Sequence, residues 1–141
     1  EFVRQARYAH VVYAPEVRHP VEVTATEQAH LVQWLSKRLG RTLKVPNLSA
    51  QGYELVGGRL LPGDTGARAQ FMFQNESGRR LTLYVRSEPG SGAETAFRYA
   101  REGKIGVFYW IDRNFGYALS GELEREELYA VASQVYRQLN P

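Results

Sequence analysis

Histidines and carboxylates are the side chains of this sequence most able to do chemistry. His10, His19 and His30 lie on different segments, and none has a second histidine or a carboxylate at the four-residue spacing of a helical metal site. Glu126 and Glu127 are adjacent on a predicted helix, so their side chains point in different directions and cannot form a facing acid and base pair. We therefore expect no metal site and no catalytic residues.

Motifs for nucleophilic or cofactor chemistry are also missing from the sequence. The chain contains no G-x-S-x-G elbow, no G-x-x-x-x-G-K phosphate loop, no G-x-G-x-x-G turn and no cysteine. We expect a protein that is not an enzyme and has no cofactor. The alternative is a hydrolase assembled from Glu16, His19 and Glu22, which a broad substrate screen would detect.

Composition indicates one globular domain. The chain has 141 residues, of which 43% are hydrophobic and 12% aromatic, enough apolar material for one core. The net charge of +3 comes from arginines scattered among glutamates without a basic run, so we expect no nucleic-acid partner. No run of about 18 apolar residues is present that could span a membrane.

Two helices are expected before the first strand. Residues 3–14 are compatible with a short helix that Pro15 ends, and an extended segment bracketed by prolines follows. Thr24 and Glu27 have the spacing of a capping box, which predicts a second helix that begins there and ends at Gly40.

Five or six strands are expected after these helices. Segments 67–74 and 81–85 alternate apolar and polar residues around a turn, which predicts a hairpin. Gly57-Gly58 lies inside the strand that precedes them and indicates a bulge or a close backbone approach. The other strands are expected at 53–61, 97–101, 105–112 and 115–119.

A C-terminal helix completes the expected architecture, from about Gly121 to Leu139 with Ser120 as its cap. Because the connections are short, a meander is the simplest topology. We predict an α+β fold in which an antiparallel meander of five or six strands packs with an N-terminal helix, a second helix and a C-terminal helix. Residues 1–23 form a helix and an extended linker, and residues 24–141 form the single α+β domain.

The strand at 105–112 has large apolar side chains on both faces. Phe108 and Trp110 share one of these faces, which the N-terminal helix covers in the simpler interpretation. In the other interpretation this face binds a protein partner or a second copy, because Trp, Tyr and Arg are common interface anchors. The expected binding residues are Met72, Tyr84, Arg86, Arg98, Phe108 and Trp110.

Six segments of the sequence carry a family resemblance. They are YAHVVYAPEVRHPVEV at 8–23, HLVQWLSKRLG at 30–40, GYELVGGRLLPG at 52–63, LTLYVR at 81–86, VFYW at 107–110 and GYALSG at 116–121. In order and spacing they resemble the part that follows the transmembrane helix in a family of proteobacterial transmembrane anti-sigma factors. The resemblance spans nearly the whole chain.

This resemblance implies a periplasmic, sensory domain of an inner-membrane protein. The whole protein would hold an extracytoplasmic-function sigma factor with a cytoplasmic domain and cross the membrane once before residue 1. Residues 1–23 would then be the membrane-proximal segment, with Glu16, Arg18 and His19 either a polar hinge or plain surface residues. The domain would act by contact with a protein partner or by self-association. The alternative is a small-ligand receptor with a pocket near Trp34, Phe71 and Phe73.

Overall fold

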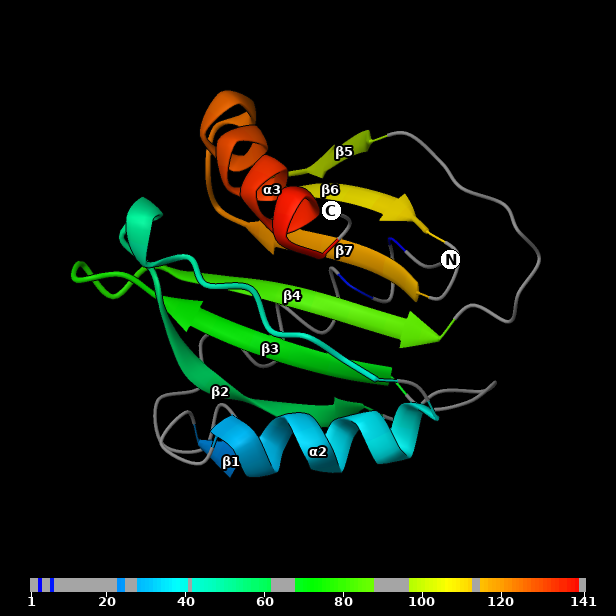
Figure 1. The fold of residues 1–141 in the computed structure, drawn as a ribbon. Helices are drawn as coiled ribbons and strands as arrows, with labels where there is room; N and C mark the ends of the chain where they lie inside the picture. Colours follow the sequence, from blue (N-terminus) through cyan, green and yellow to red (C-terminus); the bar gives the residue numbers. More distant parts are fainter. Residues whose placement is uncertain are drawn as a thin grey trace.

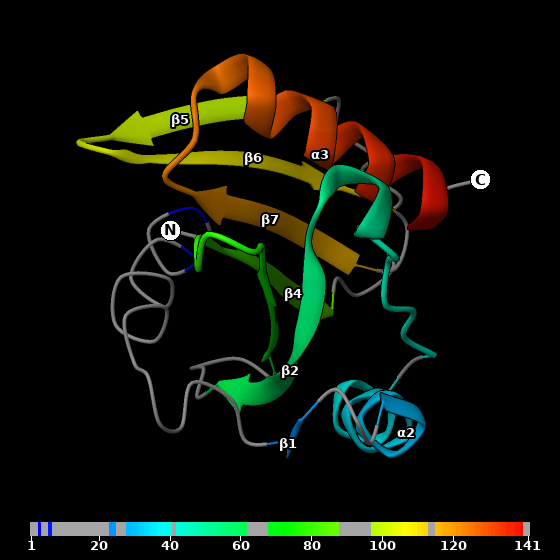
Figure 2. The same cartoon turned by 90° about the vertical axis from the view of Figure 1, so that its left-hand side faces the viewer.

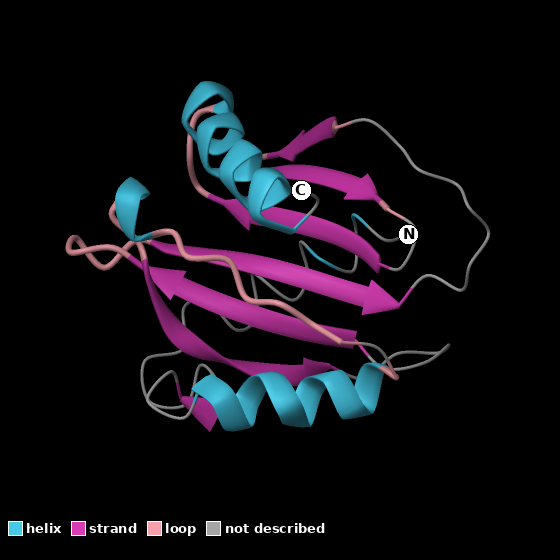
Figure 3. Cartoon of the chain, in the orientation of Figure 1, coloured by secondary structure: helices cyan, strands magenta, loops and turns pink. Residues whose placement is uncertain are grey.

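An antiparallel sheet and two helices make up the described part of the chain. The structure, a computed structural model, describes residues 3, 6, 23–24, 28–40, 42–61, 68–87, 97–112 and 115–139. The elements in these ranges are β1 (Val23–Thr24), α2 (Gln28–Leu39), β2 (Glu54–Leu61), β3 (Arg68–Gln74), β4 (Arg80–Ser87), β5 (Arg98–Glu102), β6 (Ile105–Ile111), β7 (Phe115–Gly121) and α3 (Arg125–Leu139), with a 3₁₀ turn at Ser49–Gln51 (Figure 1, Figure 3). The α+β class with an antiparallel sheet is confirmed.

The described strands form one sheet in the order β1-β2-β3-β4-β7-β6-β5. The chain crosses half of the sheet in β2, β3 and β4, leaves β4 at Ser87, and enters the far edge at Arg98. It then returns through β6 to β7, which pairs with β4 in the middle. The single meander predicted from short connections is therefore wrong, because two three-stranded meanders meet at β4 and β7.

One face of the sheet, here called the helix face, carries the main core. The segment 42–48 runs across this face between α2, which lies at the β2 end, and α3, which lies over β6 and β7 (Figure 1, Figure 2). Leu35 of α2 and Leu128 and Val135 of α3 are buried there. The sheet contributes a row of apolar side chains that includes Phe71, Phe73, Leu81, Leu83, Val85, Phe108, Trp110, Tyr117 and Leu119.

The other face, here called the opposite face, has a second and smaller apolar cluster. It joins Leu61, Tyr84, Ile105, Val107 and Ala118, which lie on four different strands. Near the start of the chain, Ala6 is buried in this cluster and Val3 packs against it. Residues close to the N-terminus therefore cover part of the opposite face.

The two residues predicted to cap helices both lie in strands. Thr24 lies in β1, where it pairs with Gly57, and α2 is described from Gln28. Ser120 and Gly121 likewise belong to β7, opposite Thr82 and Leu81 of β4, and α3 starts at Arg125. Strand pairing has therefore overridden the local helix signal at Ser120.

Other local predictions are confirmed. Gly40 ends α2 with a φ of 75°, the left-handed conformation expected of it. The β3–β4 hairpin pairs Phe71 with Leu83, and β2 has an irregular register between Leu55 and Gly57. Gly57 is also one of the two residues that β1 approaches.

Much of the expected N-terminal helix and linker falls outside the described residues. Within 3–14 only Val3 and Ala6 are described. Of the three helices predicted from the sequence, the described residues contain the second and the third as α2 and α3. The hinge candidates Glu16, Arg18 and His19 also lie outside it. Neither described helix is long and apolar enough to cross a membrane.

Candidate functional site

The structure divides the expected binding residues between the two faces of the sheet. Phe108 and Trp110 are 3% and 1% exposed and belong to the core of the helix face, beneath α3. Met72 and Tyr84 lie on the opposite face, since they alternate along their strands with Phe71, Phe73 and Leu83. The expectation that these residues form one surface with Trp110 is therefore wrong, because α3 covers the aromatic face of β6.

Trp110 belongs to an aromatic cluster that reaches the surface on α3. Its ring centroid lies 4.8 Å from that of Phe97 and 6.2 Å from that of Tyr136. Tyr129 packs edge-on against both Phe97 and Phe108. Tyr129 and Tyr136 remain 53% and 41% exposed, so these two tyrosines carry the surface part of the cluster.

Arg86 and Arg98, the two arginines among the expected binding residues, differ in solvent exposure. Arg86 is half-buried on β4, opposite Arg68 of β3. Arg98 is exposed at the start of β5, which forms the far edge of the sheet. Only Arg98 of the six expected residues is therefore well placed to meet another protein.

Strand β5 is an edge with charged side chains on both of its faces. Among the described strands it pairs only with β6. Tyr99 and Arg101 are on the helix face, where Tyr99 contacts Phe108 and lies 4.9 Å from the Arg125 guanidinium. Arg98 and Glu102 alternate with them and therefore lie on the opposite face, both exposed.

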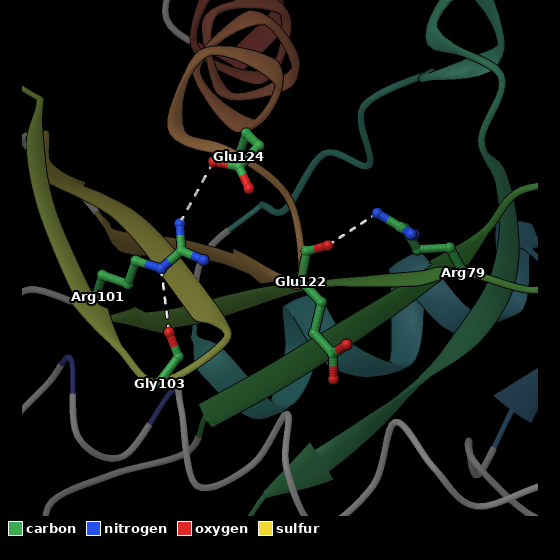
Figure 4. Close-up of polar contacts among 5 residues, drawn as sticks. All are labelled: Arg79, Arg101, Gly103, Glu122 and Glu124. Atoms are coloured by element: carbon green, nitrogen blue, oxygen red, sulfur yellow. Dashed lines mark hydrogen bonds and ion pairs between the residues drawn. The ribbon is translucent and has the colours of Figure 1, made fainter.

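Polar contacts hold the β5–β6 turn against the chain that enters α3. Arg101 Nε donates to the carbonyl of Gly103 at 3.1 Å, and its guanidinium lies 3.8 Å from the Glu124 carboxylate (Figure 4). Arg79 Nη1 donates to the carbonyl of Glu122 at 2.9 Å on the other side of the same segment. The exposed Arg101–Glu124 pair joins β5 to the chain that enters α3, and the Arg79 bond joins that chain to the residue before β4.

Four buried polar side chains lie on the opposite face and were missed by sequence reasoning. They are Arg68, Gln70, Thr82 and Ser120. Gln70 is 1% exposed, and neither its amide nitrogen nor its oxygen has a hydrogen-bond partner among the described residues. Arg68 Nε and Ser120 Oγ are also buried without such a partner there. The available signal was the alternation of Arg68 and Gln70 with Phe71, which places the two polar side chains on one face but does not show that they are buried.

Tyr117, which stacks on Trp110, has a strongly raised pKa. Burial raises the pKa of its phenol well above the ordinary value, and Asp112 raises it further by its charge and by a hydrogen bond. The Asp112 carboxylate also accepts a 2.6 Å hydrogen bond from the backbone N–H of Phe115. This arrangement closes the β6–β7 turn and keeps the phenol protonated.

The remaining candidates add no reactive group. Phe71 and Phe73, named for a ligand pocket with Trp34, are 0% and 1% exposed, and half-buried Trp34 packs against the same core. In the part of the chain that the structure describes, no three His, Cys, Asp or Glu side chains gather into a metal site. No protein-family model matches the chain, and a search of curated proteins finds no significant match.

Proposed function

We propose that this chain is the extracytoplasmic regulatory domain of a membrane-anchored anti-sigma factor and that it acts by contact between two copies of itself. The sequence resemblance supports the membrane-anchored, periplasmic role. The observation that carries the contact is the self-complementary charge pattern of the edge strand β5. The cytoplasmic part of such a protein would bind the sigma factor.

The charge pattern of β5 selects one register of self-pairing. If two copies of β5 pair antiparallel with Ala100 opposite Ala100, Arg98 of each copy faces Glu102 of the other. The same register places Tyr99 opposite Arg101 on the helix face, where a guanidinium can lie against the ring. Shifting the two strands by two residues, to bring Arg98 opposite Lys104 or Ala100, loses both opposite-charge pairs.

An unpaired edge strand needs protection or a partner, because its free backbone N–H and C=O groups can pair with another chain. Charges of one sign would keep two such edges apart. In β5 the two exposed charges on the opposite face, Arg98 and Glu102, have opposite signs instead. Self-pairing would therefore extend the sheet across two copies.

Exposed aromatic rings flank this edge. Tyr136 lies 5.3 Å from Phe97, the residue that directly precedes β5, and Tyr129 lies 6.0 Å from the same ring. Tyrosine is an amphipathic anchor that is enriched in interfaces. We assign Tyr129 and Tyr136 to the rim of the same contact.

A link from the sheet toward the membrane follows from Val3 and Ala6. If a membrane helix precedes residue 1, these side chains are the described residues nearest to it in the sequence, and they lie in the apolar cluster of the opposite face that includes Tyr84 and Val107. A change in the sheet on pairing would therefore act on the residues that enter the membrane.

Light scattering over a concentration series tests the contact. The wild-type chain is expected to pass from one to two copies as its concentration rises. Arg98→Glu, which places two carboxylates opposite each other, should stay monomeric at every concentration. Lys44→Glu reverses an exposed charge on the 42–48 segment and should dimerise like the wild type. A monomeric wild type, or an Arg98→Glu variant that dimerises equally well, contradicts the β5 contact.

The regulatory role has a separate test in the complete membrane protein. Deleting this domain while the cytoplasmic and membrane parts are kept should change transcription from promoters that depend on the bound sigma factor. Unchanged transcription would contradict the regulatory role and leave the β5 contact unaffected.

A further inference from the structure

Positive charge is concentrated in one stretch of the sequence. Residues 28–53 contain Lys37, Arg38, Arg41 and Lys44 and no Asp or Glu. These four cations exceed the net charge of +3 of the whole chain, so the remainder of the chain is close to neutral. A stretch in which cations are matched by no carboxylate attracts anionic surfaces.

The fold brings two of these cations together at the end of α2. The backbone N–H of Leu43 donates to Ser36 Oγ at 2.9 Å, so the chain turns back beside the last turn of α2. Lys37 and Lys44 directly follow these two bonded residues in the sequence. Both lysines are exposed, and among the described residues neither has a hydrogen bond or an ion pair. Both charges are therefore available to a partner.

The inner side of this part of the chain is anchored in the core. Leu35 and Leu39 of α2 and Leu43 beyond it are buried on the helix face. Gln33 and Lys37, four residues apart on α2, are exposed. The two lysines are therefore held on the outside of a packed element and not on a free tail.

Negative charge is concentrated on the other half of the sheet. Glu122, Glu124, Glu126 and Glu127 are exposed around the start of α3. α2 contacts β1, β2 and β3, whereas α3 contacts β6 and β7 (Figure 1, Figure 2). An anionic surface would attract the half that carries α2 and repel the start of α3, so it would orient the chain.

We infer that the end of α2 docks on the anionic phospholipid headgroups of the membrane to which this domain is tethered. The inference rests on the membrane-anchored role proposed above, which keeps the domain beside such a surface. Lys37 and Lys44 are the binding residues, because a cation close to anionic headgroups is attracted to their phosphates. The proposed membrane-proximal segment enters the domain at β1, and β1 contacts α2.

Docking through α2 leaves β5 accessible. In the described sheet, β5 is the edge strand opposite to the edge formed by β1 and β2. The contact with lipid and the contact between two copies therefore use different edges of the sheet, and each can be removed without the other.

Sedimentation with lipid vesicles tests the docking. Vesicles of equal parts phosphatidylglycerol and phosphatidylcholine should carry the wild-type chain into the pellet at low salt, and vesicles of phosphatidylcholine alone should not. Sodium chloride at about 1 M, which shortens the Debye length to about 3 Å, should release the chain. No sedimentation with the anionic vesicles, or binding that salt does not weaken, overturns the inference.

Charge reversals locate the contact. Lys37→Glu and Lys44→Glu each replace an attraction by a repulsion and should weaken binding to the anionic vesicles by about thirty-fold. Lys104→Glu is the matched control, because it changes the net charge equally but lies in the exposed turn between β5 and β6, and it should sediment like the wild type. Equal losses in all three variants would show a response to net charge alone and overturn the assignment to α2.

The same chains separate this inference from the β5 contact. Lys37→Glu should dimerise like the wild type, and Arg98→Glu, although monomeric, should still bind the anionic vesicles. A wild-type chain that dimerises but does not bind these vesicles overturns the docking and leaves the β5 contact standing. A short DNA duplex that binds the chain more tightly than the vesicles at the same salt would identify a nucleic-acid site and overturn the lipid assignment.

Discussion

Trp110 stacks on Tyr117, its cross-strand partner between β6 and β7, with ring centroids 5.2 Å apart and ring planes inclined by 27°. Both rings lie on the helix face, and both residues are buried. The most conspicuous aromatic residue of the strand at 105–112 therefore stabilises the fold. It is not an exposed anchor for a partner.

Replacing Trp110 by Ala should lower the free energy of unfolding by about 3–5 kcal/mol, because the change leaves a large cavity beneath α3. Urea denaturation measures this loss. Trp34→Ala is the matched control, since Trp34 is only partly buried at the margin of the same core and should cost less. Equal losses, or a Trp110→Ala chain as stable as the wild type, would contradict the placement of Trp110.

Stability should fall at alkaline pH because of Tyr117. Burial and Asp112 raise the pKa of Tyr117 in the folded chain above its unfolded value near 10. Above that pH the unfolded chain releases this proton while the folded chain keeps it, so the free energy of unfolding decreases as pH rises. Denaturation in urea from about pH 8 to pH 11 should show this decline.

The Tyr117→Phe variant isolates this contribution. It should be less stable than the wild type at neutral pH, by roughly 1.5–3 kcal/mol for a hydrogen bond to a charged acceptor. Its stability should also fall less steeply above pH 10, where the buried Tyr53, whose pKa burial also raises, still contributes. Parallel pH profiles for both chains would rule out a role for Tyr117.

A larger residue at Gly106 should destabilise the chain, because Gly106 lies where α3 meets the sheet. A Cβ there would lie 3.1 Å from Tyr99 Oη and 3.2 Å from Leu128 Cδ2. Gly106→Ala should cost about 1–3 kcal/mol through overpacking. Combining it with Leu128→Ala, which frees that space, should cost less than the sum of the two single changes. Strict additivity in urea denaturation would show that Gly106 and Leu128 are not in contact.

Gln138 should stabilise the chain by joining α3 to the segment 42–48. Its side chain accepts from Asn47 N at 2.7 Å and donates to Asn47 O at 2.8 Å. Gln138→Ala should cost roughly 1 kcal/mol, because the two hydrogen bonds are exposed to solvent. Gln134→Ala, one turn earlier on α3, is the control and should change stability less. Equal effects in thermal unfolding would show that the Asn47 contact contributes nothing.

Local patterns predicted most of the strands but not their order. The alternation in 67–74 and 81–85 gave the β3–β4 hairpin, since Phe71 and Leu83 must share a buried face. Nothing local shows that β7 returns to pair with β4, because that pairing depends on contacts far apart in the sequence. The capping signal at Ser120 failed for the same reason, since this residue is held in a strand by a distant partner.

The candidate sites were harder to predict than the fold. Alternation showed that Phe108 and Trp110 share a face, but only the position of α3 decides which face is covered. Alternation with Phe71 placed Arg68 and Gln70 together on the other face of their strand, but polar strand residues are ordinarily solvent-exposed, so the alternation did not show that they are buried. Arg98 and Glu102 gain significance only because β5 lies at the edge of the sheet.

Mixing two charge-reversed chains tests the central claim, the self-pairing of β5, most directly. Arg98→Glu carries two carboxylates at the paired positions and Glu102→Arg carries two guanidinium groups, so each chain alone should be monomeric. A mixture of the two restores opposite charges at both positions. We predict that light scattering of the equimolar mixture shows the mass of a dimer. A mixture that stays monomeric, or single variants that dimerise like the wild type, would contradict pairing through β5.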